Sequence, residues 1–167
     1  MVAPQTIPQY SNKGLPSRRS RLWRYAPLLA WMAVIFLAST GALSATNSAP
    51  AIQSLLHWLF PAITDTGVAV VHSVVRKGGH LSEYAILALL AARAFSRSSH
   101  EGLRRKWFAA ALGLVVLYSF SDEFHQSFVA SRTASVVDCL IDITGGLAAL
   151  VFYHRRHAKA SGQVKRA

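Results

Sequence analysis

The chain has 167 residues, of which 52% are hydrophobic and only 15% are charged, a composition too apolar for an ordinary soluble domain. It is also too short for two domains plus a membrane anchor, so we predict one small integral membrane protein. A formal net charge of +11 would suggest a nucleic-acid-binding protein. The basic residues lie between apolar segments rather than on one polar face, however, and we predict no nucleic-acid partner. The single cysteine, Cys139, allows no internal disulfide.

Four segments are close to the length needed to cross a bilayer, namely residues 25–43, 80–96, 107–124 and 136–153. The third has the shortest purely apolar part, so we expect its helix to continue through Asp122 and Glu123. The predicted fold is therefore all-α, a four-span transmembrane helical bundle. Residues 18–45 leave one alternative open, because a basic stretch before an apolar run that ends in small residues also fits a cleaved signal peptide.

An amphipathic helix is predicted between the first two spans. Its apolar face is formed by Ile52, Leu55, Leu56, Leu59 and Phe60, which follow Pro50 and precede Pro61. Such a helix could lie on the outer leaflet, and a helix packed over the mouth of the bundle fits the pattern equally well. The glycine pair at residues 78–79 then predicts a break or a tightening where the second span begins.

The distribution of basic residues predicts the orientation in the membrane. Fifteen of the eighteen Lys and Arg residues lie in the N-terminal tail, in the loop after the second span and in the C-terminal tail. The opposite side has only Arg76, Lys77 and Arg132, yet it holds six of the seven acidic residues. Since cytoplasmic segments retain positive charge, both termini should be cytoplasmic. We therefore predict a disordered basic tail over residues 1–24, a membrane domain over 25–153 and a second basic tail over 154–167.

Polar residues enter the outer ends of three of the predicted spans. They are Lys77, His80, Glu83 and Tyr84 in the second, Asp122, Glu123 and Gln126 in the third, and Asp138 and Asp142 in the fourth. Spacings of three, four and seven residues place the members of each set near one helix face. Because ionisable groups inside a membrane are costly, we predict one shared polar site. The alternative is that these side chains snorkel to the surface, which would suit Lys77 and Asp138 but not Glu83 and Asp142.

Charge balance limits what such a site can bind. Five carboxylates face only Arg76, Lys77 and Arg132, so an anionic ligand would meet repulsion unless protons or a metal intervened. A divalent metal that bridges carboxylates and an anionic head group would satisfy both, with His80, Glu83, Glu123 and His125 as sources of ligands. The spacing matches no strict metal signature, so the metal ligands stay unassigned.

Motifs for covalent catalysis are missing from the sequence. It contains neither a nucleophile elbow nor a glycine-rich phosphate loop, and this favours a protein that is not an enzyme. The candidates for acid or base chemistry are His80, Glu83 and Glu123. Gly145 and Gly146, with Ala148 and Ala149, are interpreted as a strip of small residues for close helix packing.

Several separated motifs resemble those of the VanZ-like family. They are Val75 to Tyr84, Ser121 to Phe128, Arg132 to Ser135 and Asp138 to Gly145, and the resemblance covers roughly residues 25–153. It implies a small multi-span membrane protein of the bacterial cell envelope, whose namesake is associated with low-level teicoplanin resistance. It also implies a set of ligand-binding residues, namely Lys77, His80, Glu83, Tyr84, Asp122, Glu123, Gln126, Arg132, Asp138 and Asp142. Relatives often have Pro and Gly where this chain has residues 129–131, so the turn there can differ.

Two functions remain open at this stage. The favoured one is a non-enzymatic protein of the inner membrane that binds a lipid-linked or anionic head group, such as a lipid-linked cell-wall precursor, and contributes to glycopeptide-type antibiotic resistance. The alternative is a metal-assisted hydrolase or transferase that acts on phosphate-linked lipids. In that enzyme Lys77 and Arg132 would hold phosphate, His80 or Glu123 would act as acid or base, and the aspartates would hold the metal. The sequence gives no indication of the oligomeric state.

Overall fold

The computed structural model describes residues 18–40, 45–129 and 135–164, and these residues form helices without any strand. The helices are α1 (Arg18–Ser39), α2 (Ala45–Leu59), α3 (Asp65–Ser96), α4 (Glu101–Arg105), α5 (Trp107–Gln126) and α6 (Val136–Val164). The all-α prediction is confirmed for this part of the chain. Most of the tail that we predict to be disordered, residues 1–17, lies outside the described residues.

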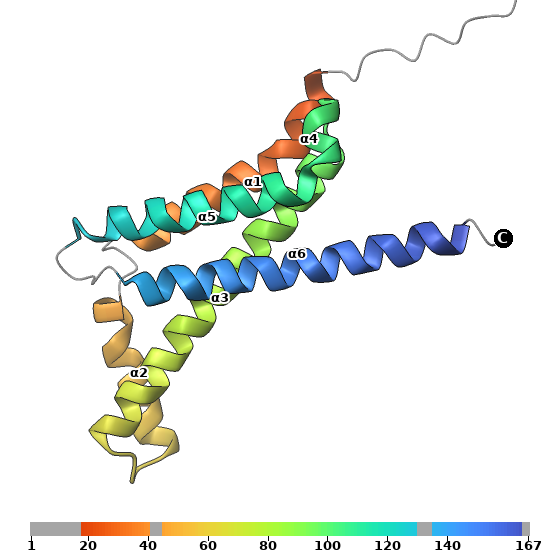
Figure 1. Cartoon of the computed structure of the whole chain (residues 1–167). Coiled ribbons are helices and arrows are strands. Elements are labelled where there is room, and N and C mark those ends of the chain that lie inside the picture. Colours follow the sequence, from red (N-terminus) through yellow and green to blue (C-terminus); the bar gives the residue numbers. More distant parts are fainter. Residues whose placement is uncertain (1–17, 41–44, 130–134, 165–167) are drawn as a thin grey trace, which may run out of the picture.

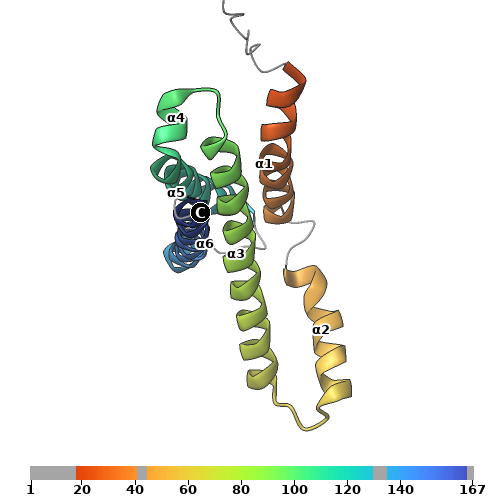
Figure 2. The same ribbon diagram turned by 90° about the vertical axis from the view of Figure 1, so that its right-hand side faces the viewer.

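Helix α3 is the centre of the fold. It is the longest helix, with 32 residues, and it contacts each of the other five (Figure 1). Its first turn is capped by Thr64, whose hydroxyl accepts a hydrogen bond of 3.2 Å from the amide of Gly67. Figure 2 shows that its N-terminal half runs beside α2, while its C-terminal half lies among α1, α5 and α6.

The predicted break at residues 78–79 is wrong, because α3 is continuous through both glycines. Neither glycine has a positive φ, and a Cβ added at Gly78 or Gly79 would meet nothing within 4 Å. Glycine permits a departure from helical geometry but does not require one. Helices α2 and α6 both pack against α3.

Small residues let α3, α5 and α6 approach closely. A Cβ at Gly145 would collide with the backbone carbonyl of Leu81, and one at Gly146 would lie 2.7 Å from a methyl group of Val115. The interpretation of Gly145 and Gly146 as a packing strip is therefore confirmed. Helix α3 contributes small residues to the same interface, namely the buried Ala88, Ala91, Ala92 and Ala94. Close contact between small residues is the usual way in which membrane helices associate.

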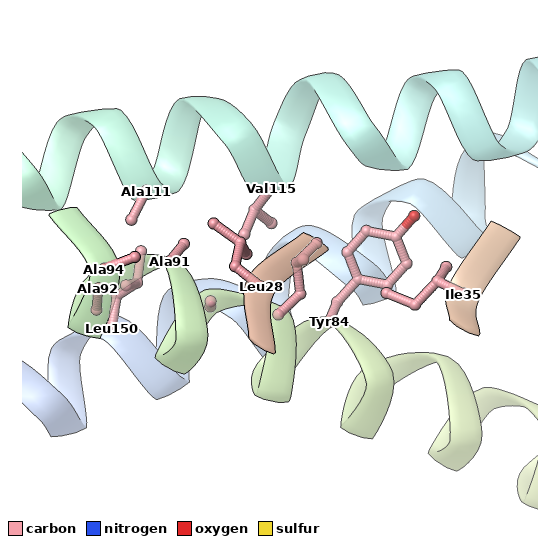
Figure 3. Close-up of a cluster of buried hydrophobic side chains, with 11 residues drawn as sticks. Leu28, Ile35, Tyr84, Ala91, Ala92, Ala94, Ala111, Val115 and Leu150 are labelled. Carbon is pink, nitrogen blue, oxygen red and sulfur yellow. The ribbon is translucent and has the colours of Figure 1, made fainter. Parts of the chain in front are cut away.

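Larger apolar side chains complete the core around Tyr84. Figure 3 shows Leu28 and Ile35 of α1, Val115 of α5 and Leu150 of α6 gathered along α3. All four side chains are at most 4% exposed. Helix α1 is further tied to the bundle by the hydroxyl of Tyr118, which donates a hydrogen bond of 2.6 Å to the carbonyl of Met32.

Within the described residues, three helices are long and apolar enough to cross a membrane, over Leu22–Ser39, Trp107–Gln126 and Val136–Ala158. By length and composition the chain is therefore a multi-pass membrane protein. The expected continuation of the third predicted span is confirmed, because α5 runs through Asp122 and Glu123 to Gln126. Helix α3 is not among these three, and the count of four spans stays a prediction.

Helix α2 forms in the predicted region but begins earlier than expected. It starts at Ala45 and contains Pro50 inside, rather than starting after that proline, and it ends at Leu59. It packs along the first half of α3 (Figure 2). Leu55, Trp58 and Phe60 remain more than half exposed. Its position on a leaflet stays a prediction.

Candidate functional site

A buried polar cluster lies where α5 ends and α6 begins, against the middle of α3 (Figure 1). Its members share an exposed fraction of 7% or less, and they are His80, Tyr84, Asp122, Glu123, Gln126, Asp138 and Asp142. These are seven of the ten residues that the sequence predicts to bind a ligand. We refer to this set as the polar cluster.

Helix periodicity explains why these side chains meet. His80 and Tyr84 are four residues apart on α3, Asp122 and Gln126 are four apart on α5, and Asp138 and Asp142 are four apart on α6. Residues with this spacing lie on one face of a helix. Apolar side chains further along α3, α5 and α6 pack these three helices together. This packing also turns the polar face of each helix inward.

Asp142 is the most deeply placed acid, with no exposed surface. One oxygen, Oδ1, lies 3.2 Å from Nδ1 of His80, and the other accepts a hydrogen bond of 3.1 Å from the hydroxyl of Ser119. Ser119 is not among the site residues predicted from the sequence. Its position three residues before Asp122 and four before Glu123, on the same face of α5, is the signal that could have identified it.

Arg76 reaches from the surface into the cluster. Its Nη2 lies 3.0 Å from Oδ2 of Asp138, and the two side chains are 32% and 2% exposed. Asp138 is therefore buried and paired, so the snorkelling interpretation is wrong for this residue. The Arg76–Asp138 and His80–Asp142 contacts are within ion-pair distance, but neither is aligned as a hydrogen bond.

The acids of α5 bind other parts of the chain. Nε2 of Gln126 donates a hydrogen bond of 3.0 Å to Asp122, and the amide of Ser135 donates one of 2.7 Å to Oε2 of Glu123. Ser135 directly precedes α6, so Glu123 accepts from one of the free amides at the start of that helix. A carboxylate at this position also interacts favourably with the helix dipole.

Six polar atoms of the cluster are buried and have no hydrogen-bond partner within the described residues. Three of them, on His80, Asp138 and Asp142, lie within ion-pair distance of a charged or ionisable partner. The other three have no such contact, and they are Oη of Tyr84, Oε1 of Glu123 and Oε1 of Gln126. Figure 3 shows the hydroxyl of Tyr84 directed toward α5. Each such group costs about 1–3 kcal/mol when it is left unsatisfied. The cluster therefore has hydrogen-bonding capacity that the described part of the protein does not use.

The other three predicted ligand residues are placed differently. Lys77 is exposed, and Glu83 is half-buried, with its backbone carbonyl accepting a hydrogen bond of 2.9 Å from Nε1 of Trp31. Arg132 lies outside the described residues. Lys77 is thus exposed and does not belong to the buried cluster.

No group of three or more His, Cys, Asp or Glu side chains could hold a metal ion in the described ranges. His125, one source of ligands considered from the sequence, instead places its ring 4.7 Å from that of Phe36. The hypothesis of a bridging divalent metal therefore has no ligand set in this part of the chain.

A model of the protein family VanZ/LLP1 matches residues 23–157. No curated protein and no solved structure matches the chain. The matched range includes every residue of the polar cluster.

Proposed function

Because the chain belongs to the VanZ/LLP1 family, we propose that it is a non-enzymatic protein of the bacterial inner membrane whose polar cluster binds the head group of a membrane lipid. In this proposal the basic tails face the cytoplasm and the polar cluster opens toward the outer leaflet. The head group that we favour belongs to a lipid-linked cell-wall precursor.

The observation that carries the proposal is the set of unsatisfied atoms on Tyr84, Glu123 and Gln126. In a membrane no bulk water satisfies buried polar groups, so unused hydrogen-bonding capacity is expensive to maintain. A ligand that brings hydroxyl or amide groups would supply the missing partners. Oxygen atoms of Glu123 and Gln126 accept hydrogen bonds, so the ligand must donate them.

The charges divide the proposed site into two parts. Arg76 and the exposed Lys77 lie toward the surface, whereas the inner acids are already engaged by His80, Ser119, Gln126 and the amide of Ser135. We therefore assign the phosphate of the lipid to the rim and its sugar to the interior. A polyprenyl phosphate that carries a sugar combines both chemistries.

A lipid-linked cell-wall precursor as ligand would connect the site with glycopeptide-type antibiotic resistance. We expect expression of the chain in a susceptible bacterium to raise the inhibitory concentration of teicoplanin. The inhibitory concentration of an unrelated antibiotic that does not act on the cell wall should stay unchanged.

The binding proposal is tested with Tyr84→Phe. This change removes a buried hydroxyl that has no partner, so the free energy of unfolding should stay level or rise by about 1 kcal/mol. Binding should nevertheless weaken about tenfold, because one hydrogen bond to the ligand is lost. The measurement is native mass spectrometry of the full chain with undecaprenyl phosphate–hexosamine as the probe.

Tyr118→Phe is the matched control. Its hydroxyl is engaged by Met32 outside the polar cluster, so this variant should lose about 1 kcal/mol of stability and keep its affinity for the probe. Equal affinity of wild type and Tyr84→Phe for the sugar-bearing lipid would contradict the proposal. The proposal would also be contradicted if wild type bound diacylglycerol, which lacks both phosphate and sugar, as tightly as it binds the sugar-bearing lipid.

The enzymatic alternative has a separate test. Release of phosphate from undecaprenyl pyrophosphate by the purified chain, if a chelator abolished it, would establish the hydrolase and displace the binding role. We expect no release, because the described residues contain neither a nucleophile motif nor a metal ligand set.

A further inference from the structure

A second charged surface lies at the end of the bundle opposite the polar cluster. It is formed by the start of α1, the end of α3, helix α4, the start of α5 and the end of α6. We define this basic face as Arg24, Arg93, Arg97, Arg104, Arg105, Lys106, Arg155 and Arg156. Arg24 is half-buried and the other seven side chains are exposed. Glu101 is the only acid of the sequence in this region.

The positive charges of this face are not neutralised within the described part of the protein. The described residues form two ion pairs, Arg76–Asp138 and His80–Asp142. Both involve acids of the polar cluster, and neither involves a residue of the basic face. Arg24 also has a buried Nη1 atom without a hydrogen-bond partner there. Like charges held together in this way repel each other unless an anion lies among them.

Arg104 is held in a fixed position. Its Nη1 donates a hydrogen bond of 3.3 Å to the carbonyl of Ser98, a residue that is 2% exposed. The hydroxyl of Ser98 in turn accepts hydrogen bonds from the hydroxyl of Tyr25, at 3.0 Å, and from the amide of His100, at 3.1 Å. Helix α4 is thus attached to α1 and α3, and a ligand would not have to order it.

Aromatic rings place the basic face at the membrane boundary. Trp107 at the start of α5 lies 5.4 Å from Tyr153 and 6.0 Å from His154 of α6, measured between ring centroids. Trp107 is the first residue of α5, and Tyr153 and His154 lie in the last two turns of the apolar span of α6, which ends at Ala158. Trp and Tyr side chains collect at the level of the lipid head groups. Lys106 and Arg155, next to these residues in the chain, therefore lie at the depth of lipid phosphates.

We propose that the basic face binds anionic glycerophospholipids, with phosphatidylglycerol as the ligand class. Guanidinium groups bind phosphate oxygens through two parallel hydrogen bonds, and seven of the eight side chains are arginines. A lipid is the occupant because apolar helix surfaces adjoin the basic face and would contact the acyl chains. This site is separate from the polar cluster and does not depend on the function proposed for that cluster.

The test compares phosphatidylglycerol with phosphatidylcholine for the full chain in detergent, by native mass spectrometry and by the thermal unfolding midpoint. Wild type should bind phosphatidylglycerol more tightly and gain thermal stability from it alone. The triple variant Arg104→Gln/Arg105→Gln/Lys106→Gln should lose about a hundredfold in affinity for phosphatidylglycerol. Arg104→Lys/Arg105→Lys keeps the charge and should retain most of the preference.

The matched control is Lys13→Gln/Lys165→Gln/Arg166→Gln, which removes three positive charges from segments that do not belong to the described structure. It should lose less than about tenfold in affinity. Equal losses in the two triple variants would show that net charge decides, and the proposed site would be wrong. Equal binding of the two lipids by wild type would also overturn it. The triple variant Arg104→Gln/Arg105→Gln/Lys106→Gln could insert in the inverted orientation, and Arg24→Gln then provides the test. The proposal predicts that Arg24→Gln loses about fivefold in affinity for phosphatidylglycerol. No loss would show that the proposal is wrong.

Discussion

Asp142 is an acidic residue in demanding surroundings. It is fully buried, and its charge faces His80 and the hydroxyl of Ser119, while Asp138 lies one turn away on the same helix. Four buried carboxyl groups share only Arg76 and His80 as cationic partners in the described structure. Removal of one partner from such a network leaves an uncompensated charge in an apolar medium, which is more costly than loss of both.

A double-mutant cycle between His80 and Asp142 tests this interdependence. Asp142→Asn and His80→Gln should each lower the free energy of unfolding by about 1–2 kcal/mol, and the double variant should lose no more than either single variant. Unfolding of the detergent-solubilised protein by a denaturing detergent is the measurement. Additive losses would show that the two side chains do not interact.

Asp142→Asn also separates function from stability. Asparagine keeps the shape of the side chain and can still accept the hydrogen bond from Ser119, so the level of protein in the membrane should stay near that of wild type. If the protein confers the proposed teicoplanin resistance, Asp142→Asn should abolish it, and Arg132→Gln should behave in the same way. Normal phenotypes in both variants would favour packing as the role of the cluster.

At the scale of the helices, glycines that look alike in the sequence differ in their contacts. Gly145 touches the backbone of Leu81 where α3 and α6 meet, whereas Gly78 has open space around its Cα atom. Both positions are helical, so propensity alone predicts the same benefit from alanine at each. Only the contact between helices distinguishes them.

Gly145→Ala and Gly78→Ala should therefore change stability in opposite directions. The first places a methyl group against a backbone carbonyl that cannot rotate away, and it should cost about 1–3 kcal/mol. The second should gain about 0.5–1 kcal/mol, because alanine loses less conformational entropy on helix formation. Thermal unfolding followed by circular dichroism measures both, and a gain at Gly145 would contradict the packing that the structure describes.

At the scale of the whole molecule, the features that could be predicted were those encoded locally. Hydropathy placed the helices over 107–124 and 136–153, and spacing along each helix identified the inward-facing His80, Tyr84 and Asp122. The pairing of Asp138 with Arg76 could not be predicted in this way, because Arg76 belongs to another helix. The same holds for the unsatisfied atoms of Tyr84 and Gln126, which only a three-dimensional arrangement can reveal.

The orientation of the molecule in the membrane gives the last prediction. The polar cluster and the basic face lie at opposite ends of the bundle. In the sequence, fifteen of the eighteen basic residues belong to the two tails and to the loop after the second predicted span. Because cytoplasmic segments retain positive charge, we expect reporter fusions at residues 100 and 160 to be cytoplasmic and fusions near residues 48 and 130 to be external.

Fusions at residues 100 and 160 must agree if α5 and α6 both cross the membrane, since two crossings return the chain to the same side. An external signal at residue 160 together with a cytoplasmic one at residue 100 would show that α5 or α6 does not cross the membrane. External signals at both residues would show that the protein is inserted in the opposite orientation. The polar cluster would then open toward the cytoplasm. A lipid-linked precursor on the outer leaflet could not reach the cluster in that orientation, so this measurement also decides which leaflet supplies its ligand.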